Sequence, residues 1–171
     1  MRILSGNINL EVQDFGSKTD IPLVMISGYG SQLVDWPKSF INNLIKHKIR
    51  VIIFDNRDVG LSHKFSGKII ENPKLIWKYS YSREKLPKEI KEPKIPYTLT
   101  NMAEDCINIL NALDIDKAHI LGTSMGGMIA QLVAFNFPKR CKSLISVMST
   151  SGNPNLPRPS KKVIEGLNRQ P

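Results

Sequence analysis

The sequence contains few of the residues that build disulfides, metal sites or membrane spans. Its two cysteines, Cys106 and Cys141, lie inside the apolar segments AEDCINIL and RCKSLISV, which favours reduced, buried thiols over a disulfide. No apolar run approaches the roughly 18 residues that a membrane span requires, and the first ten residues lack the apolar stretch of a secretion signal. The sequence therefore predicts a cytoplasmic protein without membrane association, and no residue pattern indicates a metal or a cofactor.

The net charge of +9 is unevenly distributed. Residues 64–97 hold nine Lys or Arg against four Glu, and residues 151–171 hold four against one. These two stretches account for all but one of the net positive charges, so the remainder of the chain lacks the basic face that a nucleic-acid-binding domain presents. We expect no nucleic-acid partner, although a basic binding module at residues 64–97 stays open as a lesser alternative.

Apolar patterning in the first third of the chain predicts a hairpin followed by two buried strands. Residues 3–16 alternate apolar and polar side chains around a Gly-Asn turn, as antiparallel hairpins do. IPLVMISG and RVIIFD are continuous apolar runs, typical of strands buried on both faces. Between them, residues 34–48 have helical periodicity, which predicts a right-handed strand–helix–strand unit with parallel pairing.

The second half of the chain continues the alternation of helix and strand. Thr100 is the expected N-cap of a helix with an apolar stripe, and Asp105 suits the positive end of its dipole. KAHILGT is then a strand, MGGMIAQLVAFNF an apolar helix and CKSLISVMST a final strand. The segment PKLIWKYSYSREKL, inside the basic stretch, has the pattern of a short helix.

The segment GTSMGG lies at the junction between a predicted strand and a predicted helix. At so tight a turn, side chains on Gly122 and Gly126 would collide with neighbouring backbone, and Gly127 belongs to the same structural set. Ser124 is lifted clear of the sheet as a candidate nucleophile. The N–H of Met125, at the start of the helix, points where an oxyanion would form.

The glycine-rich loop SGYGS follows the third strand and can supply a second oxyanion donor. We expect the N–H of Tyr29 to be that donor, with Gly28 close behind.

These segments resemble the α/β-hydrolase family over nearly the whole chain. GTSMGG resembles its nucleophile elbow, ISGYGSQLVDW its oxyanion loop, and FDNRDVGLS the turn after its fourth strand. The resemblance implies an α/β fold with a mostly parallel sheet of about six strands and an N-terminal hairpin. It also implies hydrolysis of a small-molecule ester or similar acyl substrate through Ser124. Ser27 stands where many relatives have histidine before the glycine.

A base for the serine is missing from the expected place. The family order is serine, acid, histidine, but no histidine follows Ser124, and the only later acidic residue is Glu165. His119 belongs to the opposite end of the strand, about 16 Å away at the usual rise per residue. His47 is expected on a helix surface. His63 follows the turn at the correct side of the sheet, although its family counterpart is not the base.

Asp55 also ends a strand on that side, which makes it a candidate triad acid. The stronger interpretation is a structural turn in which Asp55, Arg57 and Asp58 make charge-assisted hydrogen bonds.

Together with the missing acid and base, the resemblance indicates that the chain is the N-terminal portion of a truncated or split hydrolase. Residues 1–150 would form the truncated core, residues 64–97 a basic insertion, and residues 151–171 a linker toward a missing lid domain. A second chain carrying the remaining strands, an Asp and a His would complete the triad. The alternative is a catalytically inactive remnant.

Overall fold

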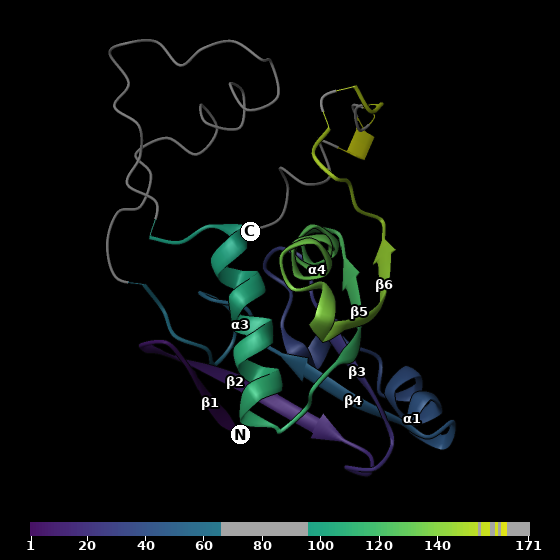
Figure 1. Cartoon of the computed structure of the whole chain (residues 1–171). Helices are drawn as coiled ribbons and strands as arrows, with labels where there is room; N and C mark the ends of the chain where they lie inside the picture. The colour runs from purple at the N-terminus through teal and green to yellow at the C-terminus, as the bar shows by residue number, and fades with distance from the viewer. Residues whose placement is uncertain (66–95, 154, 158–159, 161, 164–171) are drawn as a thin grey trace.

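The computed structural model describes residues 1–65, 96–153, 155–157, 160 and 162–163, and their strands form one six-stranded sheet (Figure 1). The strands are β1 (Arg2–Ser5), β2 (Ile8–Phe15), β3 (Ile21–Ile26), β4 (Ile49–Phe54), β5 (Ala118–Thr123) and β6 (Cys141–Val147). They lie in the order β1-β2-β4-β3-β5-β6. The hairpin β1–β2 and the pair β2–β4 are antiparallel, whereas β4, β3, β5 and β6 are parallel to one another. The predicted mostly parallel sheet with an N-terminal hairpin is confirmed.

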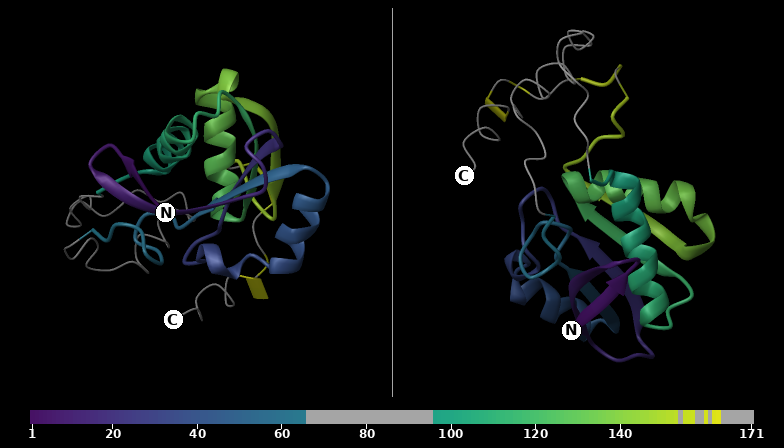
Figure 2. Two further views of the ribbon diagram at one scale, coloured as in Figure 1. Left: turned by 90° about the horizontal axis from the view of Figure 1, so that it is seen from below. Right: turned by 90° about the vertical axis from the view of Figure 1, so that its left-hand side faces the viewer.

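Helices cover both faces of the sheet. The helix α1 (Lys38–Lys46) lies on one face, and α3 (Leu99–Ala112) and α4 (Met125–Asn136) lie together on the other (Figure 2). Short 3₁₀ turns, η1 (Leu33–Asp35) and η2 (Pro138–Arg140), precede α1 and follow α4. Among the described residues, no helix has both the length and the apolar character to traverse a lipid bilayer.

The N-cap of α3 is Thr98, two residues before the predicted Thr100. The Thr98 hydroxyl accepts a hydrogen bond from the Asn101 amide, and the Asn101 side chain accepts one from the Thr98 amide. This reciprocal capping satisfies two amides at the helix start, so Thr100 lies inside the first turn.

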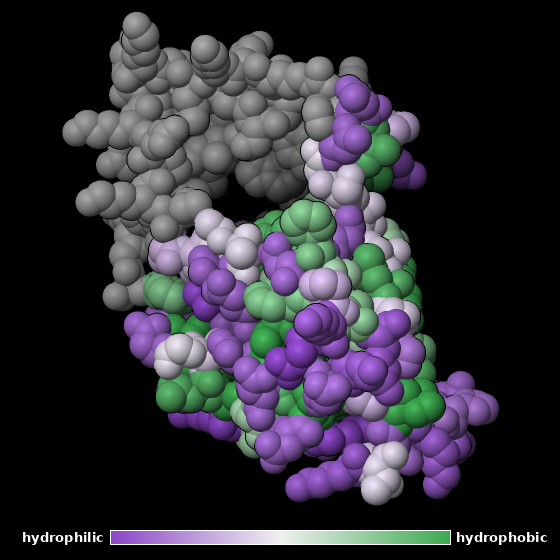
Figure 3. Space-filling view, in the orientation of Figure 1, coloured by the Kyte–Doolittle hydropathy of each residue, from purple (hydrophilic) through white to green (hydrophobic). Residues whose placement is uncertain are grey.

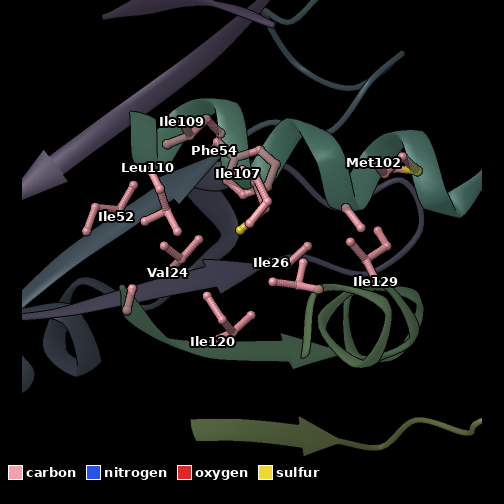
Figure 4. Close-up of a cluster of buried hydrophobic side chains, with 14 of the residues drawn as sticks. Val24, Ile26, Ile52, Phe54, Met102, Ile107, Ile109, Leu110, Ile120 and Ile129 are labelled. Carbon is pink, nitrogen blue, oxygen red and sulfur yellow. The ribbon is translucent and has the colours of Figure 1, made fainter. Parts of the chain in front are cut away.

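Alternating side chains of the central strands divide the core into two halves. Val24, Ile26, Ile52, Phe54 and Ile120 face α3 and α4, where Met102, Ile109, Leu110 and Ile129 complete the larger cluster (Figure 4). The intervening side chains form a second cluster with Ile41 of α1: Leu23, Met25, Val51, Ile53 and Leu121. Burial on both faces explains why these strands appear as continuous apolar runs.

The strand β6 is the exception, because both of its faces remain exposed. Leu144, Ile145 and Val147 are 40%, 41% and 38% exposed, although they alternate between the two faces. Among the described residues β6 pairs with β5 only, at the edge of the sheet. Apolar surface is visible on the side where α4 and β6 lie (Figure 3).

Most of the predicted basic insertion, including its predicted short helix, lies outside the described residues. Near the two ends of this stretch, Phe65 and Tyr97 pack together, with ring centroids 5.0 Å apart. Both are tied to Asp58, whose carboxylate accepts hydrogen bonds from the Phe65 amide (2.7 Å) and the Tyr97 hydroxyl (2.6 Å).

Candidate active site

Ser124 occupies a backbone conformation that ordinary residues avoid. It lies between the last residue of β5 and the first residue of α4, with φ 54° and ψ −120°, a combination that glycine dominates. Its side chain is exposed, and its amide donates to the Val147 carbonyl at the end of β6 (2.9 Å). The tight turn therefore exposes Ser124 at the carboxyl ends of the parallel strands.

Close packing explains the glycines of this turn. A Cβ on Gly122 would lie 2.0 Å from the Gly126 carbonyl oxygen, and one on Gly126 would lie 2.1 Å from the Ile26 carbonyl oxygen. Both neighbours are backbone atoms that cannot move aside. A Cβ on Gly127 would lie 2.5 Å from the Cβ of Ser149, so the third glycine admits the segment after β6.

Two backbone segments meet beside the Ser124 hydroxyl. Met125 begins α4, where the first amides of a helix have no intrahelical acceptor. Gly28 is buried on the other side, and a Cβ placed on it would lie 3.2 Å from the Ser124 Cβ and 3.8 Å from Oγ. The adjacent Tyr29 is 76% exposed. Within the described part of the chain, the amides of Met125 and Tyr29 donate no hydrogen bond.

The turn after β4 is built around Asp55. Its buried carboxylate accepts hydrogen bonds from the amides of Leu33 (2.7 Å) and Leu61 (2.9 Å). Gly60 has φ 50°, and a Cβ there would overlap the same carboxylate. Both carboxylate oxygens of Asp55 thus accept hydrogen bonds from backbone amides, in keeping with the predicted structural turn.

Arg57 has a partner that the sequence did not suggest. Its guanidinium donates two hydrogen bonds to the buried carboxylate of Asp105 on α3, at 2.6 and 2.8 Å, and these bonds raise the pKa of Arg57 against the opposing effect of burial. The Ser5 hydroxyl donates to the same carboxylate (2.5 Å). Asp105 therefore joins the hairpin, the turn and α3, instead of serving only the helix dipole.

The three histidines all lie within the described residues, and none hydrogen-bonds Ser124. The His119 ring bonds the Ser143 hydroxyl through Nδ1 (2.7 Å), near the start of β5. His47 is the exposed C-cap of α1. The His63 ring packs edge-on against Phe65 at 4.8 Å. Among the described residues, the serine and the candidate oxyanion donors come together without a base.

Comparison with known proteins identifies related sequences. The family described as alpha/beta hydrolase fold matches residues 21–169. A rhodomycin D methylesterase of Streptomyces sp. (strain C5) is 27% identical over 142 residues, which cover 83% of this chain and 39% of that protein. A 2-hydroxy-6-oxononadienedioate/2-hydroxy-6-oxononatrienedioate hydrolase of Pseudomonas putida is 39% identical over 67 residues, 37% of this chain and 24% of that protein.

Among solved structures, the enol-lactonase from Burkholderia xenovorans LB400 superimposes with a TM-score of 0.68 at 19% identity. The match covers 88% of this chain and 47% of that one, and it shows a shared fold. The matched part of the chain thus covers less than half of each of these similar proteins.

Proposed function

Because the chain belongs to the α/β-hydrolase family, we propose that the turn at Ser124 is a nucleophile elbow and that Ser124 attacks the acyl carbon of a small-molecule ester. The observation that carries this proposal is the strained, exposed serine at the start of α4, with Gly28 packed against its side chain. Backbone strain of this kind persists only where the surrounding structure enforces it. The close packing at Gly122 and Gly126 enforces it here.

The proposed reaction begins when the Ser124 oxygen forms a bond to the acyl carbon. The carbonyl π electrons move to the carbonyl oxygen, and the amides of Met125 and Tyr29, or of Gly28 in place of Tyr29, stabilise the negative charge. Collapse of this intermediate expels the alcohol and leaves an acyl-serine, which water hydrolyses. Backbone donors that are already oriented need no rearrangement during the reaction.

The serine proton needs an acceptor, which a histidine oriented by a carboxylate normally provides. We place that pair on a polypeptide segment outside these 171 residues, either a second chain or further sequence. The exposed faces of β6 support this placement, because an added strand would cover Leu144, Ile145 and Val147. A strand parallel to β6 would end beside Val147, whose carbonyl accepts from the Ser124 amide.

Two of the similar proteins favour a carboxylic ester as the substrate class. One is named a methylesterase and the other an enol-lactonase. A second candidate, a catalytically inactive remnant, is favoured by the lack of any histidine bonded to Ser124 among the described residues.

Labelling with a fluorophosphonate probe tests the proposal, with Ser124→Ala as the control. We expect the unaltered chain to label when imidazole is added as the base and Ser124→Ala to remain unlabelled. Added imidazole, which supplies a base, should raise p-nitrophenyl acetate hydrolysis above the rate measured for Ser124→Ala under the same conditions. Equal labelling of both proteins would remove Ser124 from the mechanism, and absence of labelling with and without imidazole would favour the inactive remnant.

A further inference from the structure

Asn56 is a buried polar residue next to the candidate site. It follows Asp55 in the turn after β4 and is only 2% exposed. Its side-chain Nδ2 donates a hydrogen bond to the Ser27 carbonyl oxygen at 3.0 Å. Ser27 is itself 4% exposed and immediately precedes Gly28, so this bond fixes the backbone at the entrance to the 28–32 loop.

The Ser27 carbonyl lies where three segments of backbone meet. A Cβ on Gly126 would lie 2.6 Å from this oxygen, which places the first turn of α4 directly against the end of β3. Gly28, the next residue, packs against Ser124. A shift of the Ser27 carbonyl would therefore change the distance between the loop amides and the Ser124 hydroxyl.

The other end of the same loop is held from the same turn. The Asp55 carboxylate accepts from the amide of Leu33, the first residue of η1 (2.7 Å). Two buried hydrogen bonds thus hold the two ends of residues 28–32, and both are made by adjacent residues, Asp55 and Asn56, after the carboxyl end of β4. Each of these bonds holds the backbone in place, because breaking it leaves a buried donor or acceptor unpaired.

From this arrangement we infer that Asn56 is a positioning residue: it holds the Gly28–Tyr29 backbone at the distance from Ser124 that an oxyanion donor requires. The consequence for catalysis rests on the function proposed above. The hydrogen bond from Asn56 fixes the position of the donor on the 28–29 backbone. The packing of Gly126 against the Ser27 carbonyl fixes the position of the second donor, the Met125 amide. The Ser27 carbonyl therefore aligns both halves of the oxyanion site.

Asn56→Leu tests this role, since leucine has a similar volume but no donor for the Ser27 carbonyl. Asn108→Leu is the matched control, because Asn108 also donates through Nδ2, to the Ser5 hydroxyl at 2.9 Å, but lies on α3. Asn56→Ala serves as a second variant if the leucine disturbs folding. Each protein is measured by thermal melting, by amide hydrogen exchange of the 27–33 peptide and by the second-order rate of fluorophosphonate labelling.

We expect faster exchange in the 27–33 peptide and labelling slower by about tenfold or more for both Asn56 variants, because small displacements in a reaction site cost large factors in rate. Asn108→Leu should show neither effect at a comparable loss of melting temperature. Unchanged exchange in the Asn56 variants would overturn the inference, and so would faster exchange with an unchanged labelling rate. If the unaltered chain labels neither with nor without added imidazole, the proposed function fails, whereas exchange in the 27–33 peptide still decides whether Asn56 holds the loop.

Discussion

The strained backbone at Ser124 predicts that removing its side chain stabilises the protein. At φ 54° and ψ −120°, the Cβ of an L-residue is crowded by its own backbone, and such conformations cost about 1–3 kcal/mol. Ser124→Gly removes the Cβ and with it the strain. Ser124→Ala removes the hydroxyl but keeps the Cβ, so it is the matched reference for every other effect of losing the serine.

The expected difference between the two variants follows from two opposing terms. Relief of strain favours Ser124→Gly by about 1–3 kcal/mol. The greater freedom of glycine in the unfolded chain opposes this by about 0.4–1 kcal/mol. Taking the middle of each range, Ser124→Gly should therefore exceed Ser124→Ala in free energy of unfolding by about 1.3 kcal/mol, measured by urea denaturation with equal m-values.

The comparison also separates strain from reactivity. Neither variant should react with a fluorophosphonate, since both lack the hydroxyl, and yet their stabilities should differ. A glycine variant equal to or less stable than the alanine variant would refute the argument that the fold holds Ser124 in a strained conformation.

Three further predictions follow from packing, pairing and burial. Gly126→Ala should destabilise the fold by several kcal/mol, seen as a lower urea midpoint, because its Cβ would meet the Ile26 carbonyl at 2.1 Å; a midpoint near that of the unaltered protein would contradict the packing. Asp105→Leu should lower the free energy of unfolding by about 3–5 kcal/mol, because it leaves the Arg57 guanidinium unpaired. Adding Arg57→Met should recover most of this loss in a double-mutant cycle, whereas additive losses would argue against the pair. Burial raises the pKa of the Cys106 thiol from 9.0 to about 12. The thiol ionises at lower pH in the unfolded chain than in the folded one. The buried, protonated thiol therefore contributes about 4 kcal/mol to the free energy of unfolding below pH 9, and this contribution is lost as the pH rises toward 12. Unfolding free energies measured from pH 8 to 12 should fall less steeply for Cys106→Ala, and parallel curves would count against this account.

Much of the sheet could be predicted because each strand carries its own signal. β3 and β4 are continuous apolar runs since both faces are buried, and the hairpin alternates around a turn. The turn at Ser124 was recognisable for a related reason: glycines at 122 and 126 meet steric demands that are local or involve immediate neighbours. The start of α3 was misplaced by two residues, because Thr98 and Thr100 are equivalent by type and only the partner at Asn101 distinguishes them.

Long-range polar contacts had no such signal. Asp105 accepts from Ser5, 100 residues earlier in the chain, and Asn56 donates to a carbonyl 29 residues away. In sequence each is one polar residue among many. The position of Asn56, two residues after a buried strand, was a usable hint that it matters, but nothing in the sequence indicated that its partner is the Ser27 carbonyl.

The sequence by itself determined which elements form, where the candidate nucleophile lies along the chain, and that no histidine follows it within these 171 residues, since these depend on local patterning and on composition. Only the tertiary structure decided which backbone stands beside that serine. The proximity of Gly28, the hold of Asn56 on Ser27 and the pairing of Arg57 with Asp105 arise when parallel strands end at one edge of the sheet. Chain folding brings these groups together, and the spacing of the residues along the sequence does not reveal that they are neighbours.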